Sequence, residues 1–270
     1  MIVLTLNAAL DAQVEMSAIT PEALATLKPE AIKRLKLAYG RRQVALGELF
    51  KLQGTVDTSL TIAGITPHLQ GLGAQLRSGT LHLEGHCGDE VGREMRGGEL
   101  IVHGTARDRL GAGMRGGLLR VEGSTGDFVG GGLPGATTGM KGGTILISRH
   151  AGARAGDRMR RGLIAISGNT GAGCASQMVA GTIVVLGTPG AGYATGMRRG
   201  SLLLNEAGFQ APETFVNTGQ YALSFIAVLS SYLADLEPAL RRRLRPFSAV
   251  ARWVGDRGCG GLGEILVAEG

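Results

Sequence analysis

A short glycine-rich pattern recurs along this chain at a fixed interval of 19 residues, and this repeat most constrains the fold. Each copy places a large hydrophobic residue, usually a cation, and one or two glycines before a segment with alternating apolar residues. A seven-residue insertion within the loop 126–139 lengthens one interval to 26 residues. Repetition at this period predicts stacked structural units, one per repeat. The alternating segments lie at 79–85, 98–104, 117–123, 143–149, 162–168, 181–187 and 200–206, with a weaker copy at 57–64.

Each alternating segment has the periodicity of a strand with one buried face, as in Leu100/Val102 and Ile164/Ile166. A unit of 19 residues is too short for a strand, a crossover helix and a second strand. The sequence therefore predicts an all-β fold, a right-handed parallel β-helix (a solenoid) of about 7–8 coils. The prediction includes an α+β cap at the N-terminus and a helical segment at the C-terminus.

The predicted domains are an N-terminal cap at 1–56, the glycine-rich β-helix at 57–206, and a C-terminal helical segment and tail at 207–270. In the cap we expect a first strand near 2–6, one helix within 21–40 that Thr20 caps, and a second strand near 43–50. Residues 211–253 are expected to be helical. Their apolar face would carry Phe215, Tyr221, Phe225, Leu229 and Leu233.

Two further positions of the repeat predict buried surfaces. The hydrophobe before each strand is expected to form an internal column, in which flexible methionines fill an irregular bend. The middle strand residue points to the other side and is apolar in five of seven repeats, so the C-terminal helix or another protein should cover that wall. The column is Leu76, Met95, Met114, Met140, Met159, Met178 and Met197, and the wall is His82, Ile101, Arg120, Leu146, Ala165, Val184 and Leu203.

Positive charge is concentrated at one position of the repeat. The chain has 23 Arg and 5 Lys and a formal net charge of +6. A ladder of like charges either keeps the edge soluble or binds an acidic partner or polyanionic ligand. Nucleic acid is disfavoured as a partner because only 4% of the residues are aromatic, too few to stack bases between the cations. The cations that follow the column residues are Arg77, Arg96, Arg115, Lys141, Arg160 and Arg198.

Other residue patterns do not predict an active site. Asp89, Asp108 and Asp127 stand 19 residues apart; turn hydrogen bonding is the favoured role and a cation site the alternative. The segment GAGMRG at 111–116 matches a dinucleotide-binding motif but precedes a strand instead of opening a helix. The histidines and the three cysteines lack metal-ligand or disulfide spacing, so we predict no metal site and no catalytic residue. Without a signal peptide or membrane span, a cytoplasmic location is expected.

The repeat resembles that of a known family. The pattern in GAGMRGGLLRVEG (111–123) and TTGMKGGTILISR (137–149) is similar to the carboxy-terminal domain of glutamate synthase large subunits. The whole chain, including the tail from Arg252-Trp253 to Gly263–Leu266, is more similar to the C-type subunit of formylmethanofuran dehydrogenases and of the bacterial formyltransferase/hydrolase complex.

This resemblance implies a non-catalytic structural subunit in tetrahydromethanopterin- and methanofuran-dependent one-carbon metabolism. Amidohydrolase-like and formyltransferase partners would transfer the formyl group and hydrolyse it to formate. The chain itself would bind no cofactor; the complex would use a methanofuran-type carrier, with any metals in partner subunits. Such carriers can have polyglutamate tails, for which the basic edge is a candidate docking surface.

Three alternatives stay open. The first is the corresponding subunit of a tungsten or molybdenum formylmethanofuran dehydrogenase, with molybdopterin-enzyme-like partners. The second is a glutamate synthase-like solenoid module. A remote third is a polysaccharide-active β-helix enzyme, which one Trp and four Tyr disfavour because sugar sites usually stack on aromatic rings.

Overall fold

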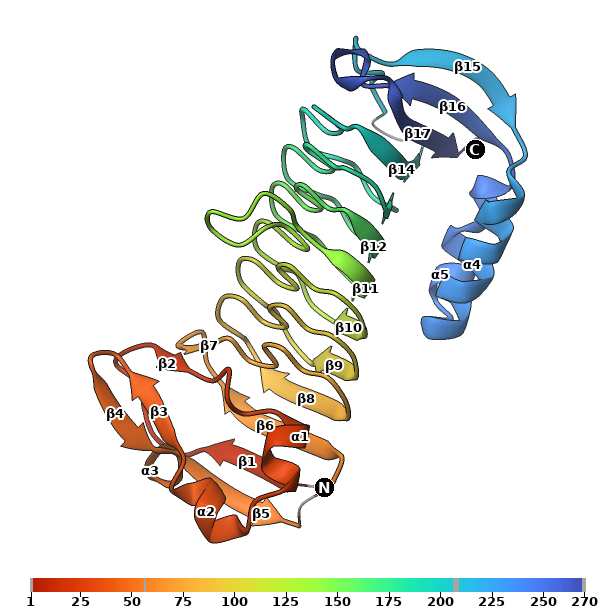
Figure 1. The fold of residues 1–270 in the computed structure, drawn as a ribbon. Helices are drawn as coiled ribbons and strands as arrows, with labels where there is room; N and C mark the ends of the chain where they lie inside the picture. Colours follow the sequence, from red (N-terminus) through yellow and green to blue (C-terminus); the bar gives the residue numbers. More distant parts are fainter. Residues whose placement is uncertain (1, 56, 206–208, 269–270) are drawn as a thin grey trace.

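The strands of the repeats form the middle of one long sheet. The computed structural model describes residues 2–55, 57–205 and 209–268, without the side chains of residues 245 and 246. The protein is mostly β, and its thirteen-stranded sheet is mixed but largely parallel (Figure 1). The repeat strands, which confirm the predicted segments, are β6 (Ser59–Ile65), β8 (Thr80–Gly85), β9 (Glu99–Val102), β10 (Leu118–Val121), β11 (Lys141–Ile147), β12 (Arg161–Ile166), β13 (Thr182–Val185) and β14 (Arg199–Asn205).

Neighbouring repeats pair in parallel with equivalent residues side by side. Leu100 of β9 lies opposite Leu81 of β8 and Leu119 of β10, at the same position of three successive repeats. The seven-residue insertion does not disturb this register, because Leu119 still pairs with Ile145. A side chain at any position of the repeat therefore has its counterparts as nearest neighbours.

The turn before each column residue joins the repeats through an alternating backbone. In the second full repeat, Glu90, Gly92 and Glu94 have φ angles of 61°, 67° and 52°. The N–H groups of Glu90 and Glu94 donate to the next repeat, to Asp108 O and Ala112 O at 2.9 and 2.8 Å, whereas Gly92 N–H donates to Leu72 O of the preceding repeat at 2.9 Å. These three left-handed residues, spaced two apart, thus direct their N–H groups in turn to the next repeat, the preceding repeat and the next repeat.

The core lies between the strands and these turns. Leu76 and the six methionines at the equivalent position are all 0% exposed. They pack in one cluster with the inward strand residues, such as Leu100 and Ile164. The repeat therefore buries one flexible side chain at its bend and two aliphatic side chains on its strand.

At the N-terminal end of the stack, β1 (Ile2–Leu6) pairs in parallel with β6 and antiparallel with β5 (Phe50–Gly54). A second sheet joins β4 (Arg42–Ala45), β3 (Lys36–Tyr39), β2 (Val14–Glu15) and β7 (Leu69–Gln70). Three short helices complete this region: α1 (Pro21–Ala25), α2 (Pro29–Lys33) and α3 (Leu46–Leu49).

The single helix predicted within 21–40 is wrong, although its start is right. Thr20 Oγ1 accepts a hydrogen bond from Ala23 N at 3.3 Å and caps α1. Pro29 then begins a second helix, because proline disfavours helical backbone at the preceding residue, and Lys28 has a ψ of 151°. Strand β3 follows where the helix was expected to continue.

The C-terminal region contains strands as well as helices. Strand β15 (Val216–Tyr221) pairs antiparallel with β16 (Val250–Gly255), β16 pairs antiparallel with β17 (Leu262–Ala268), and β17 lies parallel to β14. Between β15 and β16 lie α4 (Ser224–Leu236), α5 (Leu240–Arg243) and the 3₁₀ turn η1 (Arg245–Ser248); η2 (Arg257–Cys259) precedes β17.

The predicted helical face over 211–253 is therefore wrong for Phe215 and Tyr221. Phe215 precedes β15, and Tyr221 ends it. Gly219 disfavours a helix here, while Val216 and Thr218 suit a strand. Leu233 does lie on the buried face of α4, but Phe225 is 40% exposed.

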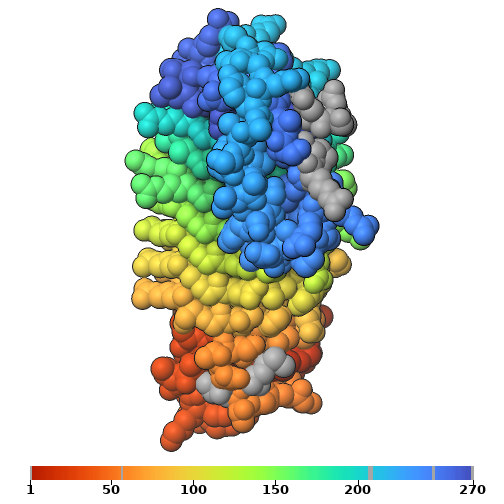
Figure 2. Space-filling view, turned by 90° about the vertical axis from the view of Figure 1, so that its right-hand side faces the viewer, coloured from red at the N-terminus to blue at the C-terminus, as the bar shows by residue number. Residues whose placement is uncertain are grey.

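Of the two covers expected for the apolar wall, the C-terminal helices supply one. Ile226 and Leu233 of α4 pack in one cluster with Leu146, Val184 and Leu203 of the wall. Figure 2 shows the C-terminal segment over the later repeats only, so that the earlier repeats are uncovered on this face. His82 and Ile101 there are accordingly half-exposed.

Asp256 closes the last repeat where no further repeat follows. Its Oδ2 accepts a hydrogen bond from Gly196 N at 3.0 Å. In earlier repeats the residue equivalent to Gly196, such as Glu94, donates its N–H to the next repeat instead. Its Oδ1 accepts one from Gly258 N at 2.8 Å. Burial raises the pKa of Asp256, but these hydrogen bonds and one from Thr214 outweigh it and leave the pKa below its ordinary value.

A pair of glycine substitutions tests the close approach of neighbouring repeats. Gly98 (φ 71°) has no room for a methyl group, because a Cβ there would lie 2.7 Å from Gly79 O. Gly135 (φ 79°) has no atom within 4 Å of its Cβ position and serves as the control. Left-handed backbone should cost alanine about 1 kcal/mol at both sites, and overlap at Gly98 should add roughly 1–3 kcal/mol. We expect thermal melts to show a clearly larger drop for Gly98→Ala, and equal drops would contradict the proposed contact.

Candidate functional site

The predicted cations stand on one edge of the stack, held by the backbone. All except Arg77 donate the backbone N–H to the carbonyl of the column residue in the preceding repeat, as Arg96 does to Leu76 O at 2.7 Å and Arg160 to Met140 O at 2.8 Å. The set is exposed throughout and is interrupted at half-buried Val179. We call it the basic edge: Arg77, Arg96, Arg115, Lys141, Arg160 and Arg198.

Most of the charge on the basic edge is not neutralised within the chain. Arg115 forms an ion pair with Glu94 at 3.1 Å, and the backbone N–H of Arg77 donates to Glu22. The side chains of Arg96, Lys141, Arg160 and Arg198 form no hydrogen bond or ion pair with any residue that the structure describes.

Sequence reasoning missed two cations beside this edge. Arg161 and Arg199 follow Arg160 and Arg198 directly and are also exposed. They occupy the position that is glycine in three of the earlier repeats. In the sequence these two arginines stand out because they depart from the repeat, not because they match it. Positive charge is therefore densest in the later repeats.

The aspartate column links successive turns. Asp89 Oδ1 accepts a hydrogen bond from Asp108 N at 3.1 Å, and Asp108 Oδ1 accepts one from Asp127 N at 2.9 Å. Asp127 Oδ1 accepts one from Ala153 N at 2.7 Å across the insertion. The column thus bonds to backbone, as predicted, but to the next repeat and not to its own turn. Within the described ranges, no group of His, Cys, Asp and Glu could hold a metal ion.

Two of the cysteines and the histidine next to one of them are not placed for catalysis. Burial raises the pKa of the Cys87 and Cys174 thiols to about 12, so both are protonated at neutral pH and are poor nucleophiles. His86, next to Cys87 in sequence, bonds to Thr105 Oγ1 at 2.9 Å. The GAGMRG segment forms a turn before β10, with Gly111 and Gly113 in left-handed backbone. No helix in the described part of the chain is long and apolar enough to cross a membrane.

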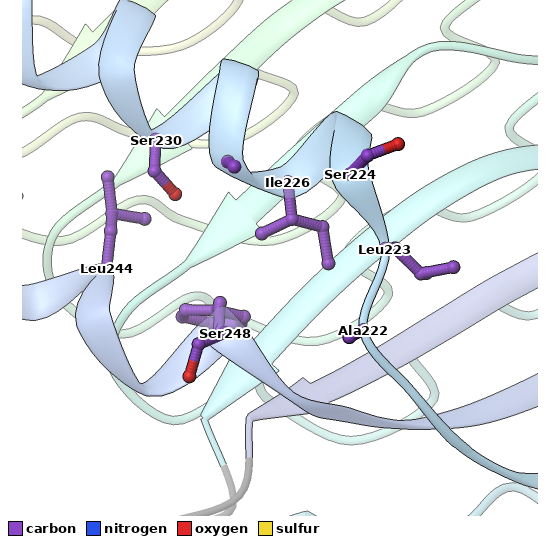
Figure 3. Close-up of a pocket in the computed structure, with 9 residues that line it drawn as sticks. Ala222, Leu223, Ser224, Ile226, Ser230, Leu244 and Ser248 are labelled. Carbon is purple, nitrogen blue, oxygen red and sulfur yellow. The ribbon is translucent and has the colours of Figure 1, made fainter.

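An apolar cavity of about 420 Å³ opens between α4 and the η1 region (Figure 3). Ile226 and Leu244 point into it, and Phe247 completes its apolar lining. The polar side chains among its described lining residues are serines: Ser224, Ser230 and Ser248. Because none of these described residues is charged, the cavity suits an apolar contact better than acid–base chemistry.

Comparison with known proteins identifies the repeat. Residues 52–226, more than half of the chain, match the family model described as GXGXG motif. A chain of the formyltransferase/hydrolase complex of Methylorubrum extorquens, whose crystal structure was solved in complex with methylofuran, has a TM-score of 0.89 and 37% identity, covering 99% of this chain and 100% of that chain. This chain belongs to the GXGXG-motif family, as a homologue of the FhcC component of that complex.

The similarity also appears in a curated sequence. The FhcC component of the formyltransferase/hydrolase complex of Methylorubrum extorquens is 38% identical over 88 residues, an alignment that spans only about a third of either protein (33% of each). The predicted family resemblance is confirmed. In the GXGXG motif itself, the structure gives positions one, three and five left-handed backbone, as at Gly192, Ala194 and Gly196.

Replacing one member of the aspartate column separates its two possible roles. Asp108→Asn keeps a side-chain oxygen for the Asp127 N–H, whereas Asp108→Ala leaves that half-buried donor without a partner. We expect the alanine variant to lose about 1–3 kcal/mol and the asparagine variant to stay close to wild type. Thermal melts in EDTA and in millimolar calcium should coincide for the wild-type protein. A calcium-induced rise in Tm that Asp108→Asn abolishes would establish a cation site instead.

Proposed function

We propose that this chain is a non-catalytic assembly subunit of a formyltransferase/hydrolase complex in one-carbon metabolism. Its homologue is a chain of a solved complex of that name, and the observation that carries the proposal is a helix that is apolar on two faces. The catalytic partners would be amidohydrolase-like and formyltransferase subunits, which transfer a formyl group to a methanofuran-type carrier and release formate.

Helix α4 buries one face against the wall and presents the other to solvent. Phe225, Val228 and Tyr232 are 40%, 71% and 45% exposed, and their spacing places them on one side of the helix. Exposed apolar side chains gathered on one side of a helix mark an interaction site. We call Phe225, Val228 and Tyr232 the outer apolar face. Val216 and Tyr221 of β15 are also exposed, at 46% and 38%.

Two further features support an intracellular, non-catalytic role. The three cysteines are free thiols, which suits a reducing cytoplasm. Two of them are buried with raised pKa values and are unsuited to nucleophilic chemistry. In this proposal, the carrier and any metals are bound by partner subunits. The oxidative alternative places the same assembly role beside molybdopterin-enzyme-like subunits.

We also propose that residues 57–206 wind as a right-handed parallel β-helix of about 7–8 coils. The in-register parallel pairing from β6 to β14 supports this winding. Residues 1–56 form a cap, and 207–270 form a C-terminal segment whose helices lie over the wall. The cap and β17 would cover the two ends, which otherwise leave strand edges open.

A single charge on the outer apolar face tests the assembly role. Val228→Asp should leave the Tm unchanged, because the Val228 side chain is already largely in water. It should weaken association with partner subunits at least about tenfold, because burying an unpaired carboxylate is costly. The measurement is quantitative mass spectrometry of proteins that copurify with the tagged chain in its own host.

Leu262→Asp is the matched control, since Leu262 is 61% exposed and lies outside the outer apolar face. We expect it to retain the partners. Recovery of an amidohydrolase and a formyltransferase with the wild-type chain would support the complex. A wild-type chain that purifies alone, or equal retention by Val228→Asp, would contradict the assembly role.

The basic edge favours a second, compatible function. We propose that it docks the polyanionic tail of the carrier. The cations recur in six of seven repeats, and neighbouring repeats are about 4.8 Å apart. They therefore present a row of positive charge to a polyanion. Arg96, Lys141 and Arg160 have side chains without a partner among the described residues, so binding would not break existing ion pairs.

Reversal of these three charges tests the docking function. Arg96→Glu, Lys141→Glu and Arg160→Glu together should weaken binding of methylofuran to the assembled complex at least about tenfold and reduce its dependence on salt. The control reverses Arg34, Lys36 and Arg41, which are exposed in the N-terminal region and change the net charge equally. If both triple variants assemble and bind the carrier like the wild type, the basic edge serves only solubility.

A further inference from the structure

The insertion in the repeat series encloses a small cavity lined by three arginines. The cavity measures about 290 Å³ and lies beneath residues 132–136 of the loop that extends outward from the stack in Figure 1. Its other walls come from three repeats and consist of Arg109, Phe128, Arg154, Asp157 and Arg158. Among the described lining residues, three guanidinium groups stand against one carboxylate, an excess of two positive charges.

The repeat itself stacks Arg109, Phe128 and Arg154. The three residues occupy equivalent positions in successive repeats, with φ angles of 59°, 60° and 57°. The guanidinium carbons of Arg109 and Arg154 lie 5.6 and 5.5 Å from the centroid of the Phe128 ring, within the range of cation–π contacts. The aromatic ring therefore holds two guanidinium groups that would otherwise repel each other.

Left-handed backbone makes this arrangement costly. The equivalent position is glycine at Gly71, Gly173 and Gly192 in other repeats, and all three have positive φ angles. A residue with a side chain costs about 1 kcal/mol more than glycine in this conformation. Four successive repeats, from Glu90 to Arg154, carry a side chain in this conformation, and the three beside the insertion form the stack that lines the cavity.

Two of the arginines have hydrogen-bonding partners within the chain, and one of them, Arg158, holds the loop. Arg154 donates to Asp157 Oδ1 from Nη2 at 2.7 Å and from Nε at 3.2 Å. Arg158 donates from Nη1 to Ala136 O at 3.3 Å and from Nε to Gln177 Oε1 at 2.9 Å. Asp157 is 7% exposed on its side chain, so its charge is buried and paired.

Arg109 has no such role. Its side chain donates no hydrogen bond and forms no ion pair with any residue in the described ranges. Its guanidinium lies over the Phe128 ring, and the half-buried residue lines the cavity. The five N–H donors of this guanidinium are therefore available to a ligand in the cavity.

We propose that this cavity binds an oxyanion, the carboxylate or phosphate group of a small ligand, with Arg109 as its main contact. Guanidinium groups recognise both anions through paired hydrogen bonds, and Phe128 keeps Arg109 in place for them. A cavity of about 290 Å³ suits a small acid or a single phosphoryl group and is too small for a dinucleotide. The site lies within one chain, so its test is independent of the assembly role.

The first experiment titrates the full chain with inorganic phosphate and, separately, with succinate, at constant ionic strength. We expect saturable binding of at least one of them at one site per chain, measured by calorimetry. Arg109→Gln should weaken it at least about tenfold, and Arg109→Lys, which keeps the charge but loses the planar fork, should fall between. Arg41→Gln is the control, because Arg41 is an exposed arginine of the N-terminal region without a side-chain partner among the described residues.

Binding of phosphate alone or of succinate alone would assign the ligand class, and binding of both would support a general oxyanion site. Failure of both probes to bind, or an equal loss with Arg41→Gln, would overturn the proposal. If Arg109→Gln lowers the Tm, phenylglyoxal labelling of the wild-type chain replaces it. The bound anion should then slow modification of Arg109 but not of Arg41, and equal rates at Arg109 with and without the anion would overturn the proposal.

Discussion

The hydrogen bonds between equivalent backbone groups of neighbouring repeats determine most other features of this protein. Strands supply the usual parallel pairing, and the turns add alternating N–H groups, such as those of Glu90, Gly92 and Glu94, that reach both neighbours. These bonds fix the spacing of the repeats near about 4.8 Å. At that distance side chains pack against their own counterparts, and a glycine such as Gly98 is required where the two backbones lie too close for a Cβ.

Such stacking forces like charges together, and the chain handles each column differently. The aspartates turn their carboxylates to backbone N–H groups of the next repeat, which lowers the cost of their repulsion. The cations of the basic edge extend into water, where screening weakens repulsion. Arg109 and Arg154 are separated by the Phe128 ring. Of the described cations in these columns, Arg109 alone lines a cavity and has no hydrogen-bonding partner among the described residues. The proposed anion site therefore rests on Arg109.

The repeat made the strands, the column and the wall predictable, because each depends only on the residue type at a fixed interval. Features that depend on departures from the interval were missed. The break at Pro29 and the strand β15 lie outside the repeat, where weak local preferences decide. The arginine cavity was missed because Phe128 and Arg154 are 26 residues apart, and the sequence does not show on which side of Phe128 the seven extra residues fall. Arg161 and Arg199 were missed because they replace the glycines that defined the pattern.

The way the stack ends explains why α4 has an exposed apolar side. After β14 the chain leaves the stack, and the strand that pairs with β14 is β17, near the C-terminus. The intervening segment must therefore run outside the stack before it returns, and it carries α4 across the wall formed by Leu146, Val184 and Leu203. A single layer of helix has a second side, and here that side presents Phe225, Val228 and Tyr232. An amphipathic helix over the wall would expose only polar side chains to water. Because α4 is apolar on both sides, it covers the wall and leaves these three side chains exposed, and the proposed assembly role rests on them.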